Sequence, residues 1–139
     1  MPQIQFKLTN RLEDLDVLCE HLASFCEECG IAKRQKFEIN LAMDELFTNI
    51  INHGFDDEIE HQIHVTCRKK GKTVIITIMD DGVPFNPVEA PQPDLNCTFS
   101  DREIGGLGIH LIKAYIDQID YRRDADANVL TLTKILKDQ

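Results

Sequence analysis

The stretch from Lys33 to His53 repeats apolar residues at the spacing of an amphipathic α-helix, and this pattern constrains the fold most. At 3.6 residues per turn its apolar side chains gather on one arc of the helix. The members of this arc are Ile39, Met43, Leu46, Phe47 and Ile50. A second helical pattern precedes it, beginning at Asn10 as the expected N-cap and ending at Gly30. Both apolar faces require a second layer to cover them.

Five other segments predict strands, either by alternating apolar and polar residues or by their content of β-branched residues. They are Ile4–Leu8, Gln62–Arg68, Thr73–Met79, Ile119–Arg123 and Val129–Ile135, with polar turns at Lys69–Lys72 and Asp124–Asn128 and one further helix at Ile109–Asp117. The most continuously apolar strand, Thr73–Met79, is expected at the centre of the sheet. The order of elements predicts an α+β two-layer sandwich, with a mostly antiparallel sheet and helices on one face. We expect residues 1–139 to form a single domain.

The charge balance limits the classes of partner. The 24 acidic and 15 basic residues give a formal net charge of −9, which argues against binding of nucleic acid through phosphate contacts. No apolar run is long enough to predict a membrane span, so we expect a cytoplasmic protein. Five cysteines without a secretory signal predict reduced thiols.

A zinc or redox site built from cysteine or histidine is not expected. Cys26 and Cys29 form an isolated C-x-x-C pair with no second pair. His61 and His64 lie on a predicted strand, where residues three apart point to opposite faces and cannot share a metal.

The polar side of the 33–53 helix has the residue composition of a functional site. Glu45, Asn49, Asn52 and His53 share the arc beside the apolar one, and the segment from Asp44 to His53 contains no Lys or Arg. Such a face suits coordination better than solvation. The alternative is that Asn49 and His53 are hydrogen-bonded residues near a helix end at Gly54.

Two further polar clusters lie where elements end. Asp80-Asp81-Gly82 ends the central strand, where Asp80 could accept a hydrogen bond from an exocyclic amine; the alternative is an Asx turn capping its own backbone. Gly105 to Gly108 precedes a helix, so its backbone N–H groups could contact a phosphate, or the glycines could only form a tight turn. Neither the P-loop nor the dinucleotide pattern is present.

A nucleotide site could use all three clusters. Asn49 could then supply an oxygen to Mg²⁺, and Glu45, one turn away, could accept a proton from an attacking hydroxyl. The segment from Pro84 to Glu103 has no periodic pattern and predicts a lid, a binding loop or a disordered insertion.

The three clusters, in this order, resemble the GHKL (Bergerat-fold) ATPase and kinase superfamily. The segment from Glu45 to Gly54 resembles its N box, Asp80 to Pro87 its D-x-G box, and Gly105 to Ile112 its second glycine box. The short length and the G-G-L-G-I-x-L-I phrase are most similar to bacterial anti-sigma-factor serine kinases of partner-switching systems.

The resemblance implies a role for each matching residue. Glu45 matches the catalytic base, Asn49 the Mg²⁺ ligand, Asp80 the carboxylate that reads adenine, and Gly82 the glycine beside it. Residues 84–104 match the ATP lid. Further matches on the cofactor side are Gly106, Leu107 and Gly108 at the phosphates, Thr133 near the adenine, and His53, which either lines the phosphate side or caps its helix.

The resemblance also implies partners. Kinases of this family dimerise, bind a sigma factor and phosphorylate a serine on an anti-sigma-factor antagonist, so we expect ATP and Mg²⁺ as cofactors and a homodimer. Some relatives carry an Arg just before the glycine box, where this chain has Ile104 and places Arg102 two residues earlier; this leaves the partner's identity open. The alternatives are a non-catalytic ATP-gated interaction module and the ATP-binding domain of a histidine kinase. The latter is disfavoured because no helix pair carrying a phosphoacceptor His is expected in this length.

Overall fold

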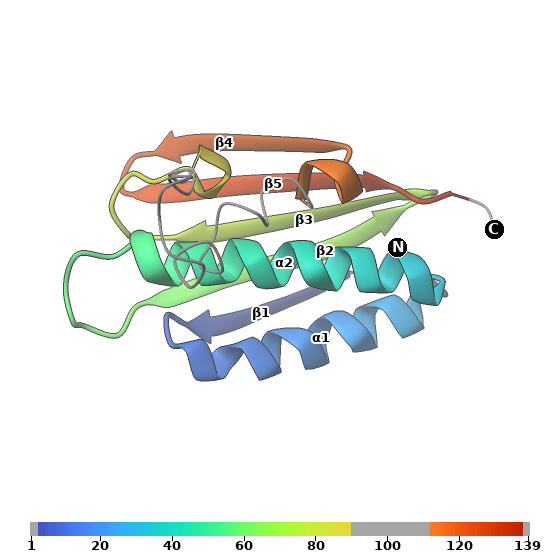
Figure 1. Cartoon of the computed structure of the whole chain (residues 1–139), viewed down its shortest axis with the longest axis horizontal. Coiled ribbons are helices and arrows are strands. Elements are labelled where there is room, and N and C mark those ends of the chain that lie inside the picture. The colour runs from blue at the N-terminus through green and yellow to red at the C-terminus, as the bar shows by residue number, and fades with distance from the viewer. Residues whose placement is uncertain (1–2, 90–111, 138–139) are drawn as a thin grey trace, which may run out of the picture.

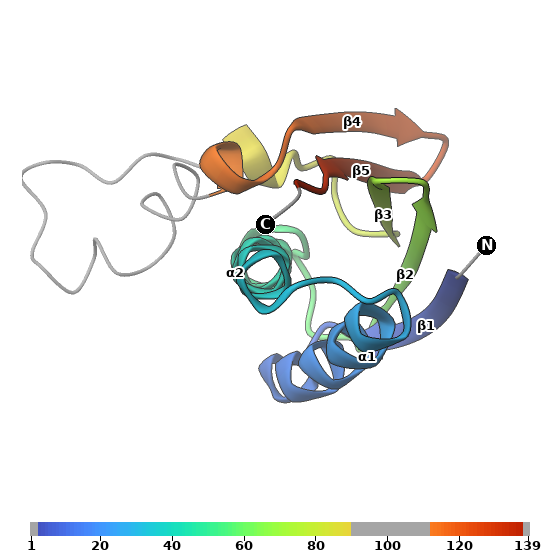
Figure 2. The ribbon, with the colours of Figure 1, turned by 90° about the vertical axis from the view of Figure 1, so that its right-hand side faces the viewer.

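The computed structural model describes residues 3–89 and 112–137, and these form a two-layer α+β sandwich (Figure 1). The sheet has five strands in the order β1-β2-β3-β5-β4, and every neighbouring pair is antiparallel. Two helices cover one face of this sheet (Figure 2). The elements are β1 (Gln3–Thr9), η1 (Leu12–Asp14), α1 (Leu15–Glu28), α2 (Lys33–His53), β2 (Gln62–Lys70), β3 (Thr73–Asp80), η2 (Pro87–Glu89), β4 (Gln118–Asp124) and β5 (Ala127–Ile135). The predicted fold class is confirmed.

The core lies between α2 and the inward face of the sheet. All five residues of the predicted apolar arc of α2 are at most 3 % exposed. They pack against the alternate residues of β3 that face the helices, Val74, Ile76 and Ile78. Because β3 is the third of the five strands, its predicted central position is confirmed.

Two predicted element ends are wrong, for the same physical reason. Asn10 does not cap α1; its Oδ1 accepts a hydrogen bond from the backbone N–H of His61 at 2.8 Å, and a 3₁₀ turn separates it from the helix. Asn128 does not belong to a turn, because Ala125 and Asp126 alone join β4 to β5 and Asn128 is a buried residue of β5. In both cases a polar side chain serves a tertiary contact that sequence spacing does not reveal.

The predicted helix Ile109–Asp117 is described only in part. Residues 112–115 are helical, and residues 109–111 lie outside the described residues, as do Gly105 to Gly108 and most of the predicted lid. Within the described ranges, no helix is long and apolar enough to cross a membrane.

A histidine closes the acidic loop between α2 and β2. The prediction that His61 is a strand residue is wrong, because β2 begins at Gln62. Its Nε2 lies 2.8 Å from Asp57 Oδ1 and its Nδ1 lies 2.9 Å from Asp81 Oδ1, while the ring stacks on Phe55. A carboxylate can only accept, so both ring nitrogens donate when the imidazole is protonated. The hydrogen bond to Asp57, with a further one to Asp81, raises the pKa of His61.

This histidine makes stability depend on pH. Its pKa is higher in the folded than in the unfolded protein, so its contribution is complete below about pH 6.5 and is lost as pH rises through the folded-state pKa. Urea unfolding measured between about pH 5.5 and 8.5 should show the wild type losing stability over the upper part of this window.

The control is His61→Gln, which keeps a polar side chain but cannot carry the charge. The difference in unfolding free energy between wild type and this variant should shrink as pH rises. A difference that stays constant with pH would contradict the stabilising contacts of protonated His61 with Asp57 and Asp81.

Candidate functional site

Three of the polar residues that the sequence singles out on α2 are buried to different extents. Asn49 is 1 % exposed, Glu45 is half-buried, and His53 lies at the exposed end of the helix with its ring 5.8 Å from that of Phe85. Among the described residues, Asn49 Nδ2 has no hydrogen-bond partner. A buried amide without a partner costs free energy, and a ligand in contact with it would remove that cost.

The carboxyl of Glu45 has a perturbed proton affinity. Burial raises its pKa, and the neighbouring Asp44 carboxylate adds to the effect. Burial raises the pKa of Asp44 as well. A carboxylate with a raised pKa is a stronger proton acceptor than an ordinary surface glutamate, which suits Glu45 to the role of a general base.

Asp80 ends β3 on the face of the sheet that the helices cover. The side chain is 5 % exposed, and its Oδ1 accepts hydrogen bonds from Gly82 N at 2.8 Å and Asn128 Nδ2 at 2.9 Å. Burial raises the pKa of Asp80, and the hydrogen bonds from Asn128 and Gly82 oppose this shift. The Asx-type bond predicted as the alternative is therefore present. Both Gly82 N and Asn128 Nδ2 donate to Oδ1, so neither of these hydrogen bonds uses Oδ2.

Asn128 is a residue of this cluster that the sequence analysis missed. It lies opposite Asp80 in the β3–β5 register and is 4 % exposed. Its Nδ2 also donates to Val83 O at 2.8 Å, and its Oδ1 accepts from Tyr121 Oη and from Phe85 N. All polar groups of the amide are used, so Asn128 fixes both the carboxylate of Asp80 and the backbone that follows it. Its position two residues after the β4–β5 turn gave no signal of this contact.

Two glycines bring the end of α2 against the turn after Asp80. A Cβ at position 82 would lie 2.1 Å from the carbonyl oxygen of Gly54, and one at position 54 would lie 2.5 Å from that of Ile50. Val83 N donates to Gly54 O at 2.8 Å across this contact. Gly54 has φ −88°, so glycine is required here for space rather than for a left-handed backbone.

The structure does not bring every predicted residue to this cluster. Thr133 pairs with Ile75 and Gln118, and the alternation along β5 places its side chain on the sheet face away from Asp80 and the helices. Gly106, Leu107 and Gly108 lie outside the described residues.

The cysteines and acidic residues give no metal site in the described part of the chain. No group of three or more His, Cys, Asp or Glu side chains there could hold a metal ion. Cys26 and Cys67 are free and buried, and burial raises their pKa to about 11 and about 12, so both thiols stay protonated near neutral pH.

Comparison with known proteins agrees with this geometry. The model of the histidine kinase-like ATPase domain family matches residues 8–134. The chain belongs to this family. The serine/threonine-protein kinase BtrW of Bordetella bronchiseptica is 33 % identical over 100 residues, which cover 72 % of this chain and 70 % of BtrW. The anti-sigma F factor of Bacillus subtilis is 24 % identical over 116 residues, covering 83 % of this chain and 80 % of that protein.

Solved structures share the fold. The RsbU and RsbW domains of a Mycobacterium tuberculosis protein superpose with a TM-score of 0.71 at 17 % identity, covering all of this chain and 34 % of the other. The catalytic domain of the histidine kinase ThkA superposes with a TM-score of 0.52 at 14 % identity, with both chains fully covered. The two-layer sandwich is therefore the architecture of the family's ATP-binding domains.

The described residues fit the nucleotide that this family of ATPase domains implies. Asn49 offers a buried amide, and the Asp80 carboxylate is held in place by donors on one oxygen, which suits it to accept from an exocyclic amine at the other. The amide oxygen of Asn49 is a hard ligand of the kind that Mg²⁺ takes singly while keeping phosphate oxygens and waters.

Replacing Gly82 by alanine should destabilise the protein, because the new methyl group collides with backbone rather than with a movable side chain. We expect Gly82→Ala to lower the unfolding free energy by about 1–3 kcal/mol or more, measured by urea denaturation. Gly71→Asn is the control, because a Cβ at position 71 meets nothing within 4 Å and Asn tolerates its φ of +60°. Equal stability of Gly82→Ala and wild type would contradict the close approach.

Removing the amide of Asn128 should leave Asp80 and Val83 without a buried donor. We expect Asn128→Ala to cost about 1–3 kcal/mol of unfolding free energy. Tyr121→Phe should cost less in the same measurement, because it leaves both bonds of Asn128 Nδ2 intact. The opposite order would show that the phenol, not the amide donor, holds this cluster together.

Proposed function

We propose that this protein is an ATP-dependent protein serine kinase and anti-sigma factor of the partner-switching type. It phosphorylates a serine of an anti-sigma-factor antagonist and binds a sigma factor or an analogous target. The observation that carries the proposal is the pairing, one helical turn apart, of the half-buried Glu45 and the buried Asn49, whose Nδ2 has no hydrogen-bond partner among the described residues. The names of the relatives, a serine/threonine kinase and anti-sigma F factors, support the same activity.

Each residue has a defined task in this reaction. Asp80 accepts a hydrogen bond from the exocyclic amine of adenine, and Gly82 lies beside the ring. Asn49 would supply an oxygen ligand to Mg²⁺, which would neutralise phosphate charge. Glu45 would accept the proton of the serine hydroxyl as that oxygen attacks the terminal phosphate, whose bond to the bridging oxygen breaks to release ADP.

The remaining parts of the proposal concern the phosphates, the lid and the assembly. Gly106, Leu107 and Gly108 would contact the phosphates, and residues 84–104 would form the lid. His53 would lie on the phosphate side of α2. We place the protein in the cytoplasm as a single domain, residues 1–139, acting as a homodimer.

Glu45→Gln tests the assigned base. Incubating the protein with Mg-ATP and candidate antagonists from the same genome should give phosphoserine, and Glu45→Gln should lower kcat about 100-fold or more. Affinity for ADP should not change, because the substitution removes only the proton acceptor. Mass spectrometry of the antagonist and binding of a fluorescent ADP analogue provide the two readouts.

Asp44→Asn is the matched control, because it removes the neighbouring carboxylate that helps to raise the pKa of Glu45. It should retain activity and move the acidic limb of the pH–rate profile to lower pH. In the wild type this limb should lie above the ordinary glutamate value of about 4.3. A Glu45→Gln variant as active as wild type would exclude Glu45 as the base. ATP binding without phosphotransfer to any antagonist would instead support a non-catalytic, ATP-gated interaction module.

A further inference from the structure

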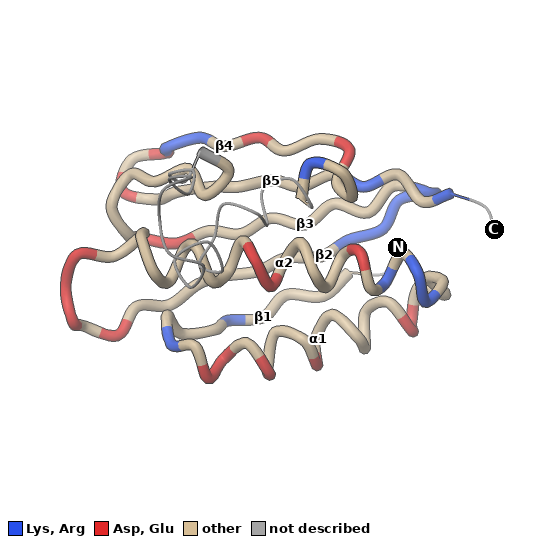
Figure 3. The backbone as a smooth tube through the Cα atoms, viewed as in Figure 1, with Lys and Arg blue, Asp and Glu red and all other residues tan. Residues whose placement is uncertain are grey.

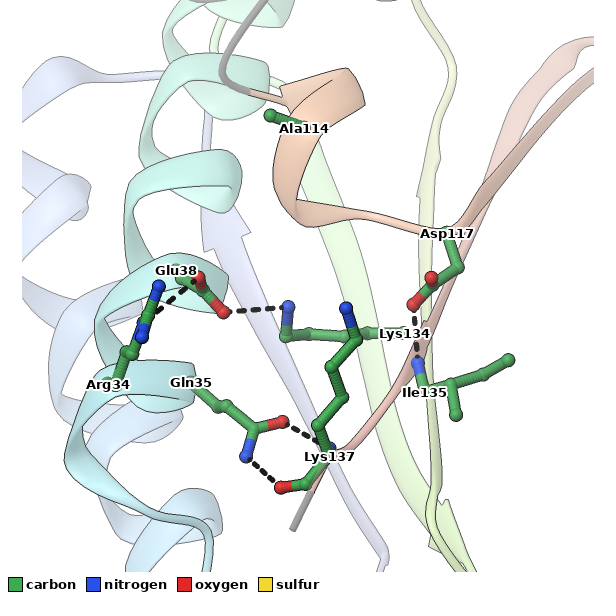
Figure 4. A pocket seen from close by; sticks show the side chains of 8 residues that line it. All are labelled: Arg34, Gln35, Glu38, Ala114, Asp117, Lys134, Ile135 and Lys137. Atoms are coloured by element: carbon green, nitrogen blue, oxygen red, sulfur yellow. Dashed lines mark hydrogen bonds and ion pairs between the residues drawn. The ribbon is translucent and has the colours of Figure 1, made fainter. Parts of the chain in front are cut away.

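A cavity of about 460 Å³ lies at the end of α2 remote from Asp80. It opens between the first turns of α2, the segment after residue 112 and the end of β5 (Figure 4). Gln35 forms a reciprocal pair of hydrogen bonds with the backbone of Lys137, at 2.8 and 2.9 Å, and so closes one side. The floor and walls of the cavity are thus fixed by contacts between α2 and the chain after β5.

Three cations and two carboxylates line this cavity. The Lys134 side chain is 8 % exposed, and its ammonium donates to Glu38 Oε1 at 3.1 Å and to Tyr115 O at 2.6 Å. Arg34 also approaches Glu38, at 3.9 Å, so two cations share this carboxylate. The second carboxylate, Asp117, accepts a hydrogen bond from the backbone N–H of Ile135 at 2.7 Å. The ammonium of Lys137 points into the same space (Figure 4) and pairs with no carboxylate of the described residues. The cations of the cavity thus outnumber its carboxylates, and a carboxylate from a partner could pair with them.

The surface around the cavity is basic as well. Lys33, Arg34 and Lys36 begin α2, and at the same end of the molecule the last residues of β2 and the turn after it carry Lys69, Lys70 and Lys72 (Figure 3). A second cavity, of about 270 Å³, adjoins the first through Gln35 and Lys137 and is lined in part by Lys69 and Lys72. In a chain of net charge −9 this basic end complements an acidic partner.

The cavity lies on the same side of α2 as the proposed base. Arg34, Glu38, Leu41 and Glu45 are spaced as neighbours on one helix face, and Arg34 is roughly 16 Å from Glu45 along the axis. A protein interface of ordinary size covers roughly 800 Å² on each partner, a patch roughly 30 Å across. A protein that presents a serine to Glu45 can therefore extend as far as this cavity. Phe37, next to Arg34 on the outer surface and 61 % exposed, offers an apolar contact there.

We propose that this basic cavity at the start of α2 is a docking site for an acidic segment of the protein substrate, with Phe37 as its apolar contact. The inference rests on the proposed kinase function and names the part of the kinase that holds the substrate. Carboxylates of the partner pair with Lys137 and Arg34 at the rim, while the buried Lys134 keeps the wall of the cavity in place.

Charge reversal at the rim tests the proposal. The KM for the antagonist should rise about tenfold in Arg34→Glu and in Lys137→Glu, measured as phosphoserine formation at about 50 mM NaCl. Phe37→Ser should also raise this KM. The kcat and the affinity for a fluorescent ADP analogue should stay at wild-type values, which also shows that the variants are folded. The wild-type KM should rise with added NaCl, because salt screens the charge pairs.

Lys70→Glu is the matched control, because it makes the same change of charge at the same end without lining either cavity. If Arg34→Glu and Lys137→Glu match Lys70→Glu in KM, the docking site is not here and the proposal is overturned. If a rim variant loses ADP binding, Arg34→Gln or Lys137→Gln takes its place. An unchanged KM in these variants also overturns the proposal. Failure of the wild type to phosphorylate any antagonist contradicts the kinase function itself, and is told apart from failed docking because only the latter leaves wild-type activity intact.

Discussion

The contact between the backbones at Gly54 and Gly82 is the constraint on which the arrangement of the site depends. It fixes the end of α2 against the turn that follows β3 through the hydrogen bond from Val83 N to Gly54 O. Since β3 is the central strand, this contact sets the position of the polar face of α2 relative to Asp80. A side chain at position 82 would separate the two layers at the point where they meet, and one at position 54 would collide with the last turn of α2 itself.

The buried polar groups beside this contact divide into two kinds. Asn128 is fully hydrogen-bonded and acts as a structural support for Asp80. Asn49, equally buried, has an amide nitrogen without a partner among the described residues. The amide that positions its neighbours is fully hydrogen-bonded, whereas the Nδ2 of Asn49 is a buried donor that a bound ligand could use.

Periodicity in the sequence predicted the elements that local pattern determines. The apolar arc of α2 and the alternation of β2 follow from burial of one face, so spacing alone revealed them, while the continuously apolar run of β3 predicted its central place. Two contacts could not be found in this way, those of Asn128 with Asp80 and of His61 with Asp81, because these partners lie 48 and 20 residues away along the chain. The basic end was hidden for the same reason, since Arg34 and Lys137 converge only when α2 packs against the end of β5.

The hydrogen bond between Tyr121 and Asn128 has a spectroscopic consequence. The chain contains no tryptophan and two tyrosines, so Tyr115 and Tyr121 dominate its near-ultraviolet emission. The phenol of Tyr121 donates to the amide that supports Asp80. This phenol therefore reports on the surroundings of Asp80, and the native protein carries its own optical probe there.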